Sequence, residues 1–459
     1  MISAVRRVLS SRFFRQSSTL QGAAVISAAG GFIGLLALTR ILGPAELAVF
    51  IMASTCYSLL WSLLNLAPAS VATSRIAASL RAGETDRMVG WVGILLRLSI
   101  LLSGVALLVG AFALPAACER FIQLNGARIG FLSALMMMVP ILDVPRIVCC
   151  SAMQAERKMN ALARVDAGQE LCRLVLVLSG ALAFGTAIGP VIGTIISSVA
   201  GSLLALDAYR RERRAEDSVL PALGTAFRTR TVPANLAVRE GAKVGVVRNV
   251  DQLGTSIFPT LFLGGVGNQE WVTYLRVAQR MITMTRLFMQ GINRTALPAL
   301  AQLAGVKDLV GLRRLYWRAS FYSGGVVTLG LLVTLPFLPF LLRATLPPEY
   351  WDPVWLLALI LAPGLAVVSF SVANDIFYLV TGQMRVAIIL SVVGLVVNTA
   401  LLTVLVHGYP RVGAAIGLTV TCCFSLAHVS YAWLWFRRND HLFLQKEPEG
   451  QLPASATAP

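Results

Sequence analysis

Long apolar stretches, each followed by a short polar or charged segment, recur along the whole chain. A helix rises about 1.5 Å per residue, so roughly 20 apolar residues cross a hydrocarbon core about 30 Å thick. Twelve stretches have this length. In the first half they are residues 20–39, 45–67, 90–114, 129–150, 168–186 and 189–208. In the second half they are residues 243–263, 271–297, 317–342, 355–380, 386–406 and 413–436.

Composition supports this pattern. Hydrophobic residues make up 56% of the chain, charged residues only 13%, and the mean hydropathy is +0.74. One soluble core cannot cover so much apolar surface, so the chain is predicted to be an all-α polytopic membrane protein.

Lysine and arginine predict the orientation, because they concentrate in cytoplasmic connections. With the N-terminus inside, most of the 39 Lys and Arg residues fall in inner connections. The outer connections hold only Arg40, Arg120, Arg128, Arg343 and Arg411. We therefore expect both termini in the cytoplasm. The net charge of +17 follows from this topology and gives no reason to expect nucleic acid as a partner.

The longest connection divides the twelve segments into six and six. We predict an N-terminal six-helix bundle (residues 1–208), a basic cytoplasmic linker (209–242), a C-terminal six-helix bundle (243–436) and a disordered cytoplasmic tail (437–459). Transporters built from two structural repeats show such a division, with the substrate site between the repeats near the midplane.

Catalytic motifs are not found. The seven cysteines have no metal-type spacing, the three histidines are far apart, and neither a P-loop nor an HExxH motif occurs. The outer connections are also short, whereas a membrane glycan polymerase or ligase would be expected to carry its catalytic groups on a large outer loop. The sequence therefore predicts no enzyme and no cofactor.

Segment 271–297 is amphipathic. At 100° per residue its polar side chains fall on one arc of about 140°. The opposite face is formed by methionine, isoleucine, valine and phenylalanine side chains. The polar residues on the arc are Arg276, Gln279, Arg280, Thr283, Arg286, Gln290, Asn293 and Arg294.

An arginine near the bilayer centre costs roughly 2.5 to 3.5 kcal/mol, whereas a leucine returns about 0.5 kcal/mol. Arg280 and Arg286, nearest the middle of the segment, should therefore face water or anions. The alternatives are buried salt bridges for this pair and snorkelling to the interface for the outer arginines, such as Arg276. The arc supplies six predicted substrate-binding residues, namely Arg276, Gln279, Arg280, Arg286, Gln290 and Asn293.

The preceding segment also has a polar stripe, with Arg248, Asp251 and Gln252 on one face. We assign Arg248 and Gln252 to substrate binding. A weaker stripe includes Asn374 and Asp375. Asp251 and Asp375 are candidates for proton or sodium coupling, with structural pairing as the alternative for each.

Two acid–arginine pairs in the first half have helix-pair spacing. Asp143 with Arg146, and Glu170 with Arg173, are predicted to form internal ion pairs instead of ligand contacts. Arg97 has no such partner. A cationic cleft between two halves would suit an anionic substrate, since a guanidinium binds phosphate in a bidentate manner. A lipid pyrophosphate bearing sugars fits this chemistry.

Two stretches resemble a known family. Residues 28–53 resemble the first-hairpin signature of the oligosaccharide flippases (Wzx-type polysaccharide exporters) of the multidrug/oligosaccharidyl-lipid/polysaccharide transporter superfamily. Arg40, Leu42, Gly43 and Pro44 match its R-x-L-G-P turn, while its usual Phe-Gly is Leu47-Ala48 here. Residues 274–300 resemble its eighth span. Glu349 and Tyr350 resemble its acidic-aromatic entry to the tenth span.

The resemblance implies a MATE-like transporter fold of about twelve helices in the bacterial inner (cytoplasmic) membrane. It implies translocation of undecaprenyl-pyrophosphate-linked oligosaccharide for lipopolysaccharide or exopolysaccharide biosynthesis. The implied partners are the lipid bilayer, the lipid-linked oligosaccharide, a polysaccharide polymerase and chain-length or export proteins. A multidrug/cation antiporter of the same superfamily is the main alternative and would use carboxylates in the cleft.

Overall fold

The structure is a computed structural model that describes residues 12–65, 68–216, 218–266, 268–286 and 309–439. These residues are almost entirely helical, and none of them lies in a strand. The prediction of an all-α polytopic membrane protein is confirmed. Predicted residues Gln290 and Asn293 lie outside the described part of the chain.

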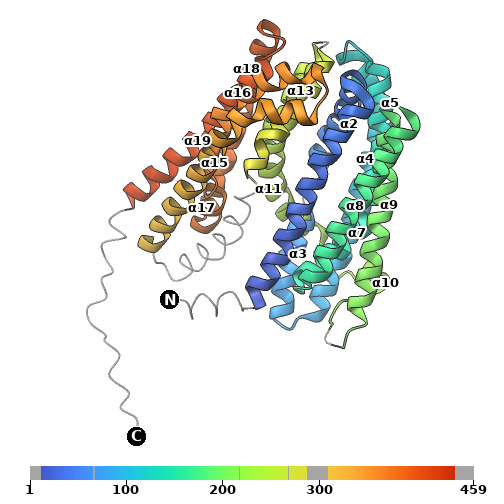
Figure 1. Ribbon diagram of the computed structural model, residues 1–459. Coiled ribbons are helices and arrows are strands. Elements are labelled where there is room, and N and C mark those ends of the chain that lie inside the picture. The colour runs from blue at the N-terminus through green and yellow to red at the C-terminus, as the bar shows by residue number, and fades with distance from the viewer. Residues whose placement is uncertain (1–11, 66–67, 217, 267, 287–308, 440–459) are drawn as a thin grey trace.

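The helices of the first half form one group in Figure 1, coloured blue to green. They are α2 (Arg12–Leu64), α3 (Pro68–Arg81), α4 (Thr85–Phe121), α5 (Gly126–Met136), α6 (Met138–Leu142), α7 (Val144–Ala155), α8 (Met159–Phe184), α9 (Ile188–Arg213) and the short α10 (Leu223–Arg228).

The helices of the second half form the other group, coloured yellow to red. They are α11 (Ala234–Gln252), the π-helical turn η1 (Leu253–Ile257), α12 (Phe258–Gly265), α13 (Gln269–Thr283), the 3-10 turn η2 (Met284–Arg286), α15 (Leu309–Thr345), the 3-10 turn η3 (Pro348–Tyr350), α16 (Trp351–Ser369), α17 (Asn374–Thr381), α18 (Met384–Gly408) and α19 (Gly413–Arg438).

Within the described residues, eight helices are long and apolar enough to cross a membrane, or nine if the bent stretch Gly126–Leu142 and Val144–Ala155 is one span. This number differs from the twelve segments predicted from sequence, because the observed helix breaks do not fall at the predicted segment ends. Segments 20–39 and 45–67 are merged in α2, and segment 243–263 is interrupted by η1. Segment 271–297 continues beyond the described residues.

Gly43 separates two helical stretches of α2. Its backbone is not helical, with φ 67° and ψ 172°, and a Cβ at this position would have no heavy atom within 4 Å. Glycine is therefore favoured here by conformation and not by lack of space. The break lies in the R-x-L-G-P sequence.

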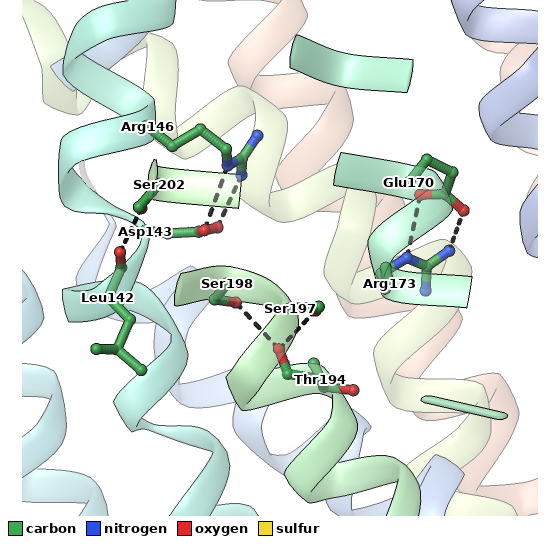
Figure 2. Close-up of polar contacts among 9 residues, drawn as sticks. All are labelled: Leu142, Asp143, Arg146, Glu170, Arg173, Thr194, Ser197, Ser198 and Ser202. Atoms are coloured by element: carbon green, nitrogen blue, oxygen red, sulfur yellow. Dashed lines mark hydrogen bonds and ion pairs between the residues drawn. The ribbon is translucent and has the colours of Figure 1, made fainter. Parts of the chain in front are cut away.

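A bend of 40° separates α6 from α7. Pro145, at the start of α7, has no N–H to donate to the preceding turn. Ser202 of α9 donates to the carbonyl of Leu142 at this break, and Asp143 forms its ion pair with Arg146, with Arg146 Nη2 2.7 Å from Asp143 Oδ2 (Figure 2). The bend is thus stabilised by Ser202 from α9 and by the ion pair between Asp143 and Arg146.

Helices α8 and α9 pack backbone against backbone at glycines. A Cβ at Gly189 would overlap the carbonyl oxygen of Gly180, and a Cβ at Gly193 would lie 2.7 Å from Val177 Cα. Membrane helices depend on such close packing, because lipid offers no hydrophobic gain for association.

The connection between the halves packs on the first half. Arg97 of α4 donates to the carbonyl of Thr229 at 2.9 Å, so the arginine without a predicted partner anchors this connection. Thr231 donates to the carbonyl of Asp86 at 3.1 Å, and Glu240 of α11 accepts from Arg75 Nε of α3 at 2.9 Å. Residues 218–240 thus follow the end of the first half that carries α3 and α10 (Figure 1).

The two halves also meet at the opposite end, the one predicted to be outer. Thr273 of α13 donates to the carbonyl of Pro44 at 2.9 Å, and Arg40 Nε donates to the carbonyl of Thr345 at 3.1 Å. Asn125 donates to Gln269 at 3.2 Å. In Figure 1 the two groups of helices approach each other at this end and diverge toward the end that carries α3 and α17.

The α8–α9 contact gives a stability prediction. Gly193→Val places its side chain against the backbone of Leu176 and Val177, and we expect about 2 to 3 kcal/mol of destabilisation from overpacking. The measurement is thermal unfolding of the purified protein in detergent. Gly104→Ala is the matched control, because a Cβ there would have no heavy atom within 4 Å. Equal unfolding temperatures for the two variants would contradict the packing.

Candidate functional site

A cavity of about 660 Å³ lies between the two halves. Both stretches of α2 and one face of α8 line it from the first half, and η1, α13, α16 and α19 line it from the second. Ligand sites of drug-sized molecules have volumes of roughly 300 to 1,000 Å³. The cavity is therefore large enough to hold the polar part of a substrate.

Three guanidinium groups line this cavity, those of Arg173, Arg276 and Arg280. Arg276 Nη1 donates to Ser256 Oγ at 2.9 Å, and Arg280 Nη2 donates to the carbonyl of Ala28 at 3.1 Å. Among the side chains that the structure describes, no carboxylate lines the cavity. The described polar surface is therefore cationic.

Arg173 has a carboxylate partner behind the cavity wall. Its Nε donates to Glu170 Oε2 at 3.0 Å, and its Nη2 donates to Glu170 Oε1 (Figure 2). The predicted pair is therefore present. Arg173 also lines the cavity, a position that its pairing with Glu170 does not predict.

The π-helical turn η1 brings polar side chains to the wall. Gln252, Thr255 and Ser256 line the cavity at this turn. Asn398 of α18 is buried and donates to the carbonyl of Gly254 at 2.8 Å, while it accepts from Thr421 Oγ1 at 2.6 Å. A π-helical turn leaves backbone groups without their usual α-helical partners, so Asn398 stabilises the turn that positions Ser256.

Glycines of α2 make room for the arginines. A Cβ at Gly31 would overlap Arg280 Nη2 and would lie 3.5 Å from Arg173 Nη2. Both guanidinium groups therefore approach the position that a side chain at Gly31 would occupy. Any larger residue at this position would displace the Arg280 guanidinium.

The structure places four of the predicted site residues on the cavity wall, namely Gln252, Arg276, Gln279 and Arg280. Arg286 belongs to η2, but its side chain lies outside the described part, as do the side chains of Arg248, Asp251 and Asp375. The structure thus brings the N-terminal part of the arc together with Gln252 from the stripe of the preceding segment.

The third stripe leads elsewhere. Asn374 and Tyr378 are buried, and the Tyr316 hydroxyl donates to Asn374 Oδ1. The Tyr378 hydroxyl lies 3.1 Å from His428 Nδ1. Tyr316 and Tyr378 belong to a buried cluster rich in aromatic residues at the end of the second half that carries α17, and none of these four residues is among those that line the cavity.

Sequence reasoning missed several cavity residues. Arg173 is assigned only to an ion pair with Glu170, and Thr255 and Ser256, which follow the stripe of Arg248, Asp251 and Gln252, receive no role. The hydroxyls of Ser54, Thr55 and Ser58 also line the cavity. The closely spaced Gly30, Gly31 and Gly34 were the available signal, because small residues in a span permit close approach.

The fold resembles that of solved transporters at low sequence identity. A multidrug resistance MATE family transporter of the MOP superfamily in an inward-facing conformation has a TM-score of 0.74 at 16% identity, over 93% of this chain and 96% of that chain. An outward-facing conformation of such a transporter gives 0.63 at 16% identity, over 94% and 96%. A Vibrio cholerae MATE transporter gives 0.65 at 16% identity, over 94% and 98%.

No protein-family model matches the sequence, and no curated protein matches it. At this level of identity the solved structures show the fold alone. The chain is a multi-pass membrane protein with the fold of the MATE transporters of the MOP superfamily.

Proposed function

We propose that the protein translocates lipid-linked oligosaccharide across the inner membrane by alternating access, with an undecaprenyl pyrophosphate as the lipid anchor. The observation that carries this proposal is the cluster of three guanidinium groups in the cavity between the halves, with no carboxylate among the described lining side chains. The protein is then a transporter and not an enzyme.

The chemistry of the cavity suits a substrate with a strongly anionic centre. A guanidinium presents a planar fork of N–H donors that matches phosphate oxygens. The described contacts of Arg276 and Arg280 are to neutral oxygens, of Ser256 and Ala28, and not to acids. Their positive charge is therefore available to a pyrophosphate, while sugar hydroxyls can bond to Ser54, Thr55 and Gln279.

The conformation supports loading from the cytoplasm. The halves are joined at the end predicted to be outer, through Thr273 with Pro44 and Arg40 with Thr345. The inward-facing neighbour also has the higher TM-score, 0.74 against 0.63 for the outward-facing one. In our proposal this is the state that accepts substrate from the inner leaflet.

The proposed transport also involves partner proteins and coupling to an ion gradient. With both termini cytoplasmic, delivered oligosaccharide would reach a polysaccharide polymerase and chain-length or export proteins on the outer side. Asp251 and Asp375 are the proposed sites for proton or sodium coupling, and Arg248 and Arg286 are proposed to extend the cationic surface.

A multidrug antiporter is the second candidate, favoured by the fold similarity to two multidrug resistance MATE transporters. Carboxylates in the cavity would stabilise a cationic drug, whereas guanidinium groups repel it. Reconstitution of the purified protein into vesicles separates the two functions. We expect transfer of a fluorescent undecaprenyl-pyrophosphate-linked sugar between leaflets and no accumulation of a cationic dye; the reverse result would establish the antiporter and reject the flippase.

Loss of the cavity charge gives a direct prediction. Arg276→Ala and Arg280→Ala should each lower lipid-linked sugar transfer by about tenfold or more, because each removes a charge-assisted contact worth roughly 1.5 to 3 kcal/mol. Arg164→Ala is the control, since Arg164 is an exposed arginine whose only described acidic neighbour is Glu212 at 3.7 Å. Transfer at the wild-type rate in both cavity variants, at equal protein levels, would exclude a role for the cationic wall.

Gly31→Ala tests the same surface without removing a charge. The new methyl group overlaps Arg280 Nη2, which lies at the end of a flexible side chain, so we expect little loss of stability but a displaced guanidinium. Transfer of the lipid-linked sugar should fall several-fold, while the thermal unfolding temperature stays close to that of wild type. Gly325→Ala, whose Cβ would have no heavy atom within 4 Å, should retain full transfer.

A further inference from the structure

We infer that Glu170 is an internal counterion that competes with the substrate anion for Arg173 and thereby weakens binding enough to permit release. This inference rests on the proposed function, because it assumes an anionic substrate in the cavity. It assigns a role in setting affinity to a residue that does not itself line the cavity.

The geometry of the pair supports competition. Glu170 and Arg173 lie one turn apart on α8, and both carboxylate oxygens accept from the guanidinium, with Nε 3.0 Å from Oε2 (Figure 2). The Arg173 side chain is 44% exposed, whereas that of Glu170 is only 16% exposed. The carboxylate is thus largely buried, whereas the guanidinium that it binds belongs to a residue that lines the cavity.

The pair also lies beside a second cation. The guanidinium groups of Arg173 and Arg280 both approach Gly31 of α2, and a Cβ on the adjacent Gly30 would lie 3.3 Å from Glu170 Cγ. Arg280 donates to the backbone oxygen of Ala28, a neutral acceptor. Two guanidinium groups and one carboxylate therefore converge on the same stretch of α2.

Electrostatics gives this arrangement a function. Without substrate, the Glu170 carboxylate offsets repulsion between Arg173 and Arg280, two like charges that both approach Gly31. A pyrophosphate would use the same guanidinium donors and would be repelled by the nearby carboxylate. The carboxylate therefore lowers the affinity of the cavity for the anion. It also binds the Arg173 guanidinium again when the anion leaves.

The other acid–arginine pair of the first half provides a comparison. Asp143 and Arg146 have the same i, i+3 spacing and a similar bidentate contact (Figure 2). Neither residue lines the cavity. This pair therefore holds the bend between α6 and α7, whereas the pair on α8 is placed to respond to a ligand.

The test measures anion affinity in the purified full-length protein. Inorganic pyrophosphate and undecaprenyl pyrophosphate in nanodiscs are titrated separately, which separates recognition of the phosphate centre from recognition of the lipid. We expect Glu170→Gln to bind both probes about tenfold more tightly than wild type, the scale of one screened charge interaction, and to transfer lipid-linked sugar more slowly. Glu170→Asp, which keeps the charge, should return affinity toward the wild-type value.

Asp143→Asn is the matched control and should leave pyrophosphate affinity unchanged. If Glu170→Gln cannot be purified, Glu170→Ala replaces it with the same expectations. Wild-type protein that binds neither probe would reject the proposed function itself. Wild-type protein that binds them, with the Glu170 variant binding equally or more weakly, would reject the counterion role while leaving the proposed function intact.

Discussion

The cost of placing guanidinium groups at membrane depth governs the arrangement of this protein. Each arginine near the bilayer centre costs roughly 2.5 to 3.5 kcal/mol unless it meets water or a polar partner. The structure meets this constraint by turning Arg173, Arg276 and Arg280 into one cavity between the halves. The partners are a carboxylate for Arg173, a hydroxyl for Arg276 and a backbone carbonyl for Arg280.

Irregular backbone and small residues make this cavity possible. Gly31 lets two guanidinium groups approach α2, and the π-helical turn carries Ser256 to a position where it accepts from Arg276. The carbonyl of Gly254 at the turn is not left unpaired, because Asn398 donates to it. Non-helical backbone is tolerated at membrane depth only where protein or a water-filled cavity satisfies it.

Much of the fold follows from sequence because apolar length and helical period are local properties. In the described part of the chain the apolar segments are largely helical, although the helix breaks do not fall at the predicted segment ends. The arc through Arg276, Gln279 and Arg280 lies on the cavity side of α13. The position of Arg173 on the cavity wall could not be predicted from these local properties. Its spacing from Glu170 indicates a pair, but whether the paired arginine also reaches a cavity depends on how closely α2 packs on α8.

The weaker polar stripe, which includes Asn374, shows the same limit of sequence-based prediction, because this residue does not line the cavity. A stripe of polar residues on a membrane helix has two solutions, a cavity or a neighbouring helix that supplies partners. Here Tyr316 donates to Asn374 Oδ1, and Tyr378, which lies in a buried aromatic cluster, is 3.1 Å from His428 Nδ1. Only tertiary packing distinguishes this case from that of α13.

The fold does not identify the substrate, because one fold can carry different sites. Two of the solved structures with this fold are multidrug resistance MATE transporters, and at 16% identity their function cannot be assigned to this chain. The sign of the charge in the cavity is the more direct argument. A cationic drug would have to desolvate beside three guanidinium groups, whereas a pyrophosphate would replace water with donors already fixed by Ser256, Ala28 and Glu170. The positive charge that makes an arginine costly in a membrane is thus also the charge that favours an anionic substrate in this cavity.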